Sequence, residues 1–316
     1  MSEGPEVKRT ADKIAEAILG KSIVDIQGKA IEHRLREKIV GSKVLAVDTY
    51  GKNIIIHFSG DIFLRNHMMM WGKWRIYKRA EYDSGKAKPL PRIIWKRKLR
   101  KSKSNSGSIE NALVKSKTTE SIQNDSRTRL ILVTDTHVAV QYNGPILQFT
   151  EDNPLHHESI TRLGPDALKS SFNMRKAKDR LIERENMKLA DLLLDQTFVA
   201  GIGNKYKSEI LFLQKLWPFN PASSLSLSKQ QRLLKSIRAV LKAGYLNAGR
   251  TRSQQKGEPS NKWDYRHWVF RRAGKPCWVC GTKIVMDRQS SSRVTFWCSR
   301  CQHPLVSKTS SVKLVL

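Results

Sequence analysis

Apolar positions in the first twenty residues recur at the spacing of one helix face. Val7, Ala11, Ile14 and Ile18 lie three or four positions apart, which predicts an amphipathic helix packed on a core. Pro5 suits the first turn of such a helix. The residues before it would lie at the positive end of the helix dipole. We expect an ionised carboxylate to be favoured there and a protonated amine to be disfavoured.

After this helix the pattern changes to short alternating or β-branched runs separated by turn dipeptides, which is typical of strands. We expect an antiparallel β-sandwich behind one leading helix. The expected strands cover residues 22–26, 43–49, 53–58, 61–64, 73–77, 92–95, 129–134, 137–141 and 146–149. Residues 99–128 are rich in Ser, Lys and Asn and poor in aromatics, which predicts a disordered insertion between two strands.

From about Asn173 the apolar spacing becomes helical again. One face is predicted through Leu189, Leu192, Leu193 and positions 196 and 197, and the sequence from Gly201 to Gly203 interrupts it. Residues 205–212 resume the helical spacing, and a further helix is predicted over about 228–243. The predicted domains are a β domain at 1–150, a helical domain at 151–258 and a metal-binding domain at 259–304, followed by a tail at 305–316.

Four cysteines, the only ones in the chain, form two CxxC motifs near the C-terminus. Cys277 and Cys280 are separated from Cys298 and Cys301 by seventeen residues, the spacing of a zinc ribbon with one tetrahedral Zn²⁺. Four thiolates leave no open coordination position, so the predicted zinc is structural. Two disulfides are the alternative. They fit less well because no apolar signal segment begins the chain.

The charge balance adds a partner to this picture. The chain has 58 Lys or Arg against 28 Asp or Glu, a formal net charge of +30. Such an excess predicts binding to nucleic acid, because basic side chains neutralise phosphates and release counterions. A charged tail does not explain the excess. The most tail-like stretch, residues 99–128, contains six basic and three acidic residues and so contributes only +3. No segment has the length of a spanning helix and no lipidation motif occurs. We therefore expect a cytoplasmic or nucleoid-associated protein without a membrane partner.

Four separated segments together resemble the formamidopyrimidine-DNA glycosylase and endonuclease VIII family. They are SEGPEV at 2–7, YGK at 50–52, DQTFVAGIGNKYKSEILF at 195–212 and SSRVTFWCSRCQ at 291–302. The resemblance spans nearly the whole chain, except the predicted insertion and the last dozen residues. It implies an α+β multidomain fold: an N-terminal helix with an antiparallel β-sandwich, a helix-two-turns-helix domain and a C-terminal zinc ribbon. It also implies a monomer that binds damaged double-stranded DNA.

The resemblance further implies an N-terminal amine that attacks C1′ of a damaged nucleotide, so that the base leaves and the strand is nicked by elimination. An α-amine has a large neutral fraction near neutral pH, as such a nucleophile requires. Removal of Met1 would make Ser2 this nucleophile. Relatives usually have proline here, so lyase activity could be weaker, and the alternative is that Met1 stays and Ser2 is a spacer. Glu3 matches the family's general acid and base, and Glu6 matches a position with a supporting role.

Other matched positions imply contacts with DNA. Lys52, in a turn between strands, matches a lysine that reaches the sugar or phosphate at the lesion; a solvated turn lysine is the alternative. Met69 and Met70 match side chains that fill the gap left by a flipped nucleotide. Trp71 fits either that role or a core position.

Asn204 would begin a helix after the Gly-rich break, where backbone N–H groups, assisted by the Asn204 side chain, would bind a phosphate. The nearby Lys205 and Lys207 and the family pattern favour this interpretation over a plain turn. Arg293 matches an arginine on the phosphates that flank the lesion. Asp166 matches an acidic position that we expect to hold structure near the site.

The substrate is less defined by the sequence. The segments WGKWRIY and SRVTFWC look more like the endonuclease VIII branch, which implies oxidised pyrimidines. Two alternatives remain: a lesion-binding protein on the same scaffold without chemistry, and a general zinc-ribbon protein that binds nucleic acid.

Overall fold

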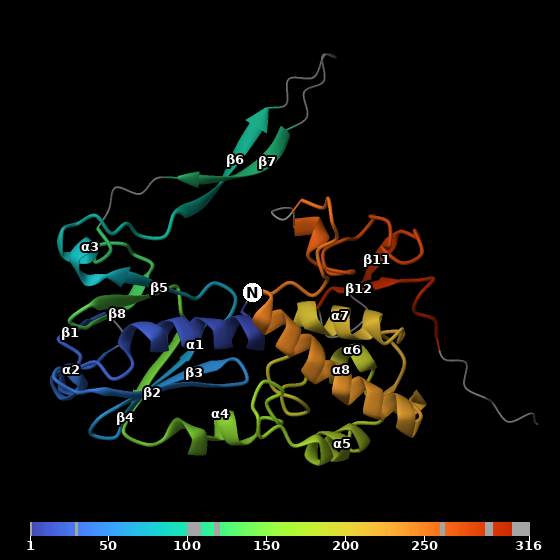
Figure 1. Ribbon diagram of the computed structural model, residues 1–316, viewed down its shortest axis with the longest axis horizontal. Coiled ribbons are helices and arrows are strands. Elements are labelled where there is room, and N and C mark those ends of the chain that lie inside the picture. Colours follow the sequence, from blue (N-terminus) through green and yellow to red (C-terminus); the bar gives the residue numbers. More distant parts are fainter. Residues whose placement is uncertain are drawn as a thin grey trace, which may run out of the picture.

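The computed structural model describes residues 2–28, 31–99, 109–116, 121–259, 263–287 and 293–304. Its N-terminal part is the expected β-sandwich of two antiparallel four-stranded sheets, with strand orders β1-β8-β9-β5 and β10-β4-β3-β2 (Figure 1). The strands are β1 Asp25–Gln27, β2 Val44–Tyr50, β3 Asn53–Phe58, β4 Ile62–His67, β5 Lys73–Lys78, β8 Thr128–Val133, β9 His137–Tyr142 and β10 Ile146–Thr150.

Helix α1 (Gly4–Ile18) is the predicted leading helix and packs on strands of both sheets. Its apolar face, including Val7 and Ile14, is fully buried in the core between the two sheets. The helix start is fixed to the helical domain, because the Gly4 N–H donates to the Gly201 carbonyl at 2.8 Å. The two glycines allow this close approach: a Cβ on Gly4 would lie 3.0 Å from the Gly201 backbone. The shorter helices α2 (His33–Ile39) and α3 (Arg79–Asp83) were not predicted.

The predicted disordered insertion is wrong for part of its range. Strand β6 (Arg92–Leu99) pairs antiparallel with β7 (Ile109–Ser116), and this hairpin projects from the sandwich in Figure 1. Residues 121–128 return to the sandwich, where Ile122 and Asp125 are buried. The Arg127 guanidinium donates to the Asp125 carboxylate at 2.6 Å, which allows that charge to be buried. Residues 100–108 and 117–120 lie outside the described residues.

The helical domain follows. Its helices are α4 (Glu158–Thr161), α5 (Met174–Ile182), α6 (Leu189–Leu192), α7 (Asn204–Leu213) and α8 (Leu227–Leu246). The helical face predicted as far as position 197 is wrong, since α6 ends at Leu192. The Gln196 amide stabilises the loop instead, donating to the carbonyls of Leu194 and Ile202 at 2.8 and 2.9 Å and accepting from the Gly201 N–H at 3.1 Å.

The C-terminal domain is a small hairpin of β11 (Ile284–Asp287) and β12 (Thr295–Cys298), which lies beside α7 (Figure 1). The segment before it is held by Glu209 of α7, whose buried carboxylate accepts from the N–H groups of Trp268, Val269 and Phe270, each at 2.9 Å. Glu209 is thus a structural link between the last two domains. Within the described ranges, the longest apolar helix falls short of what a bilayer crossing requires.

Candidate active site

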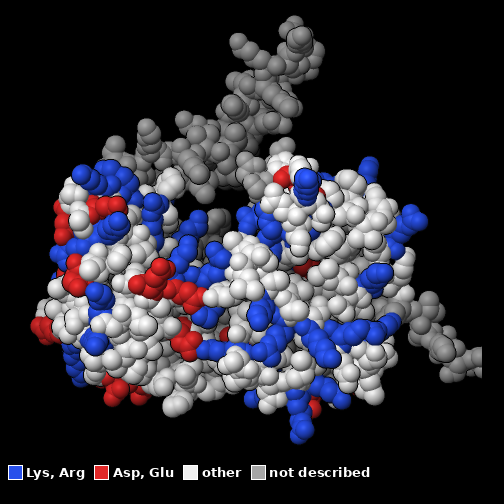
Figure 2. All heavy atoms as spheres, viewed as in Figure 1, with Lys and Arg blue, Asp and Glu red and all other residues white. Residues whose placement is uncertain are grey.

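A cavity of about 370 Å³ opens where the chain start, the β-sandwich, the helical domain and the C-terminal hairpin domain meet. Figure 2 shows Lys and Arg side chains gathered around the hollow between the sandwich and the hairpin domain. Its walls contain seven of the residues predicted from sequence: Ser2, Glu3, Lys52, Met69, Met70, Asn204 and Arg293. Segments nearly three hundred residues apart are thereby brought to one place.

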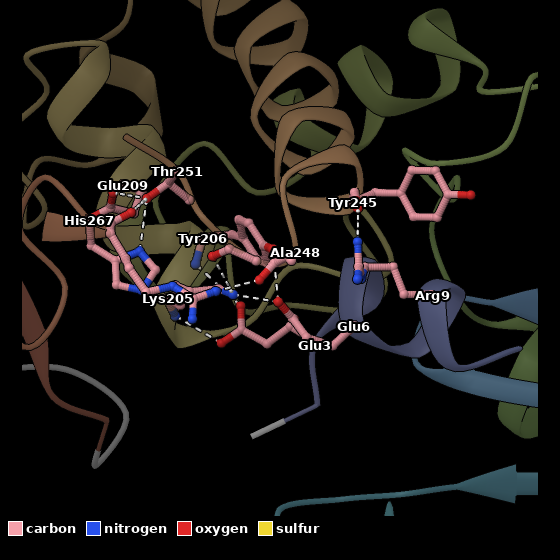
Figure 3. Close-up of polar contacts among 12 residues, drawn as sticks. Glu3, Glu6, Arg9, Lys205, Tyr206, Glu209, Tyr245, Ala248, Thr251 and His267 are labelled. Carbon is pink, nitrogen blue, oxygen red and sulfur yellow. Dashed lines mark hydrogen bonds and ion pairs between the residues drawn. The ribbon is translucent and has the colours of Figure 1, made fainter. Parts of the chain in front are cut away.

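Glu3 is the buried acid of this cavity, with 2% of its surface exposed. Its carboxylate accepts from the backbone N–H groups of Lys205 and Tyr206, at 2.9 and 3.2 Å, in the first turn of α7 (Figure 3). Burial raises the pKa of Glu3, and the nearby Lys205 charge and the hydrogen bond from its N–H oppose this. Gly203 permits the approach, since a Cβ there would lie 2.3 Å from the Glu3 carboxyl carbon.

Lys52 reaches the cavity from the turn between β2 and β3. Burial lowers the pKa of its ammonium to about 8, the Glu3 carboxylate opposes the shift and the Arg293 charge adds to it. The turn is fixed by Asp166, whose carboxylate accepts from the N–H groups of Gly51 at 2.8 Å and Leu168 at 2.9 Å. Asp166 is 4% exposed and lies outside the cavity lining, which agrees with its expected structural role.

The residues after β4 form a turn at the cavity rim. Gly72 donates to the Met68 carbonyl at 2.8 Å, and Met69 has the left-handed φ of 50°. Met68 is buried, whereas Met69 and Met70 are 48% and 49% exposed and line the cavity. Trp71 is 71% exposed and does not line it, so its alternative core position is wrong.

His67 lines the same cavity and was not predicted. Its Nδ1 accepts from the Met69 N–H at 3.2 Å, which places the proton of the neutral ring on Nε2. Burial, together with the charges of Lys52 and Arg65, lowers the pKa of His67 to about 4. The ring is therefore neutral at physiological pH.

The predicted phosphate site at the start of α7 is wrong in two respects. The N–H groups of Lys205 and Tyr206 bind Glu3 and are not free for a phosphate. Lys205 and Lys207 are 8% and 0% exposed, so neither faces solvent. Asn204 itself lines the cavity, and its Oδ1 accepts no hydrogen bond from the described residues.

Glu6 lies behind Glu3, in a second cavity of about 180 Å³, and is absent from the lining of the first. Its Oε1 accepts from Lys205 Nζ at 2.5 Å and from the Tyr206 hydroxyl at 3.1 Å (Figure 3). Lys205 Nζ also donates to the Gly249 carbonyl at 3.2 Å. Glu6 thus holds the two residues whose N–H groups bind Glu3, and this geometry gives it a positioning role.

Leu194, Gln196 and Gly203 complete the cavity wall without having been predicted. Gln196 and Gly203 lie inside a segment that carries the resemblance, so that segment was a usable signal. Nothing in the local pattern marks Leu194 or His67.

The four cysteines converge at the far end of the hairpin. The Sγ atoms of Cys277 and Cys301 are 3.9 Å apart, those of Cys280 and Cys298 are 3.4 Å apart, and all four ligand atoms lie within 4.8 Å of one another. These separations exceed the ~2.05 Å of a disulfide. They fit a tetrahedron around zinc, whose S–S edges are about 3.8 Å for Zn–S bonds of about 2.3 Å. The cysteines are unbridged, so the disulfide alternative is wrong.

Three family models match the chain in order. Residues 1–145 match the formamidopyrimidine-DNA glycosylase N-terminal domain, residues 163–256 its H2TH domain, and residues 274–304 a zinc finger found in FPG and IleRS. Among curated proteins the chain is similar to endonuclease 8 of Escherichia coli strain 536, with 29% identity covering 96% of this chain and 100% of the relative. Endonuclease 8 of Escherichia coli strain HS is also 29% identical, with the same coverage.

Solved structures show the same fold. Lactococcus lactis Fpg bound to DNA with an abasic site superposes with a TM-score of 0.71 at 20% identity, covering 95% of this chain and 99% of that one. The wild-type Lactococcus lactis protein bound to DNA with N7-benzyl-Fapy-dG gives the same TM-score and coverage at 21% identity.

Proposed function

The chain belongs to the formamidopyrimidine-DNA glycosylase family, on its endonuclease VIII side, and from this premise we propose a function built on the cavity at Glu3. The protein is a DNA glycosylase of base excision repair with abasic-site lyase activity. Its partner is double-stranded DNA that contains a damaged base or an abasic site, and it acts as a monomer in the cytoplasm or on the nucleoid.

One observation carries this proposal: the residue after Met1, a buried acid with a raised pKa and two cations share one cavity. They are Ser2, Glu3, Lys52 and Arg293. A nucleophile, a proton carrier and positive charge for a phosphate are what glycosidic cleavage on DNA requires.

The steps assign a role to each residue. The Ser2 amine, freed when Met1 is removed, attacks C1′ of the damaged nucleotide, and the C1′–N bond to the base breaks with its electron pair leaving on the base. Glu3 moves the protons: it gives one to the departing base, takes one from the attacking amine, and returns that one to the ring oxygen as the C1′–O4′ bond breaks and the imine forms. Loss of a proton from C2′ of the imine then expels the 3′ phosphate by elimination.

The remaining cavity residues position the DNA. Lys52, Asn204 and Arg293 contact the phosphates that flank the lesion, and Met69 and Met70, with Trp71 beside them, fill the gap left by the flipped nucleotide. The four cysteines hold one structural Zn²⁺ per chain. Its binding energy stabilises the hairpin that carries Arg293.

Borohydride trapping tests the proposal. With duplex that contains an abasic site, reduction of the imine leaves a covalent protein–DNA adduct, and mass spectrometry of the adduct places DNA on Ser2. Glu3→Gln should bind the same duplex but excise the base about 10² to 10⁴ times more slowly. A lesion-binding protein without chemistry would give no adduct, and a general zinc-ribbon protein would be unaffected by Glu3→Gln.

The preferred substrate in this proposal is an oxidised pyrimidine, as the resemblance of WGKWRIY and SRVTFWC to the endonuclease VIII branch implies. Single-turnover excision from matched duplexes with thymine glycol or 8-oxoguanine measures this preference. Faster release of 8-oxoguanine than of thymine glycol would contradict the preference for pyrimidines but not the proposed reaction.

A further inference from the structure

Lys207 is a fully buried lysine on α7, with 0% of its surface exposed. Its Nζ donates to the Thr295 hydroxyl at 2.8 Å and to the Val294 carbonyl at 3.4 Å. Both acceptors belong to the zinc domain, at the start of β12. The lysine therefore joins the helical domain to the hairpin through its charged end.

Burying this ammonium is unfavourable. Among the residues the structure describes it has no ion-pair partner. Burial, with a contribution from the Arg293 charge, lowers the pKa of Lys207 to about 8, while the Asp191 and Glu3 charges oppose the shift. An apolar side chain of similar length would avoid the cost. The two hydrogen bonds to the hairpin are what the lysine provides.

These bonds hold the chain directly after Arg293. Val294 and Thr295 are the next two residues, and Phe296 donates its N–H to the Ser208 hydroxyl of α7 at 3.4 Å. Arg293 lines the cavity while its neighbours are fixed to the helix. The first turn of the same helix binds Glu3 through two N–H groups. One helix thus sets the places of both the acid and the arginine.

We propose that Lys207 is a positioning residue that holds Arg293 at the cavity, in register with Glu3, so that Arg293 contacts a phosphate of the DNA. This inference rests on the proposed function for the DNA contact of Arg293. It assigns Lys207 no contact with DNA, although its charge near Asn204 favoured a phosphate site in the sequence.

The test is a double-mutant cycle read by binding. Lys207→Met, Arg293→Ala and the double variant are titrated at one fixed salt concentration with duplex that carries a tetrahydrofuran abasic analogue. Each single substitution should weaken binding about tenfold, and Lys207→Met should change the affinity less than about twofold in the Arg293→Ala background. Lys235→Met, which removes an exposed lysine of α8, serves as the matched control and should stay within about twofold of the parent.

Two further measurements separate positioning from folding. Zinc content and Tm are recorded for every variant. Thr295→Val removes the hydroxyl that accepts the hydrogen bond from Lys207, and its loss of affinity should equal that of Lys207→Met. When the two substitutions are combined, their losses should not add. Equal losses for Lys207→Met with and without Arg293 would overturn the proposal, as would full affinity in Lys207→Met or Thr295→Val. Because the analogue is not cleaved, failure of the Ser2 chemistry would leave this result readable.

Discussion

Replacing Lys52 by methionine should stabilise the folded protein and weaken its binding to damaged DNA. Methionine keeps most of the unbranched stem and removes a buried ammonium whose pKa falls from 10.5 to about 8. At about 1.4 kcal/mol for each pH unit, the buried charge costs about 3 kcal/mol. Because the Lys52 side chain keeps some exposure to solvent, we expect a gain of about 2 kcal/mol in the free energy of unfolding at pH 7.

The direction of the Lys52 pKa shift determines how the stability gain changes with pH. The pKa of Lys52 is lower in the folded state, so between pH 8 and 10.5 the unfolded chain binds more protons and stability rises with pH. The cost of the buried charge is fully present below about pH 8 and disappears near pH 10.5. The advantage of Lys52→Met should shrink over that window.

Urea unfolding of both proteins at pH 7, 8, 9 and 10 measures the effect. Lys78→Met, at an exposed lysine of β5, is the matched control and should change stability by less than about 0.5 kcal/mol. Affinity for damaged duplex should fall about tenfold in Lys52→Met and stay near the parent value in the control. A variant less stable than the parent at pH 7, or a gain that does not change between pH 7 and 10, would refute the reasoning.

Three other changes probe the site and its supports. Glu3→Gln should slow base excision by a factor of about 10² to 10⁴, the usual contribution of a general acid or base, and single-turnover kinetics with a binding control will show whether chemistry alone is lost. Asp166→Ala leaves the N–H groups of Gly51 and Leu168 without an acceptor, so it should lower the free energy of unfolding in urea by about 1–3 kcal/mol and slow excision. Asp166→Asn keeps one acceptor oxygen and should lower stability less. Removal of zinc by a chelator, or Cys298→Ser, should abolish binding to damaged duplex because the hairpin unfolds. Re-addition of Zn²⁺ should restore binding only in the chelated parent, and binding that survives complete removal of zinc would contradict this role.

Much of the fold followed from local patterns. The face of α1 and the alternating strands of the sandwich are set by which positions are apolar, and the structure confirms them. The errors occur where local pattern and tertiary contact disagree. The helix expected as far as position 197 stops at Leu192, because Gln196 satisfies the backbone of a loop. Strand β7 lies in a stretch whose composition predicted disorder.

The candidate site was predictable to the extent that its residues belong to recognisable segments. Seven predicted residues line one cavity, although no local property of Ser2, Lys52 or Arg293 indicates that they meet. His67 was missed because a single histidine after a strand carries no pattern. Lys205 and Lys207 misled for the opposite reason: two lysines at a helix start favour a phosphate site until their partners are known.

The sequence by itself determined most of the helices and strands, the four cysteines of the metal cluster and the overall positive charge, because periodicity, cysteine spacing and composition are local or additive properties. Only the tertiary structure decided which charges face solvent and what each carboxylate binds. Glu3 occupies the N–H groups expected to hold a phosphate, and Lys207 is committed to the hairpin. Burial and pairing depend on residues distant in sequence. They decide whether an ionisable group assists the nucleophile, contacts DNA or stabilises the fold.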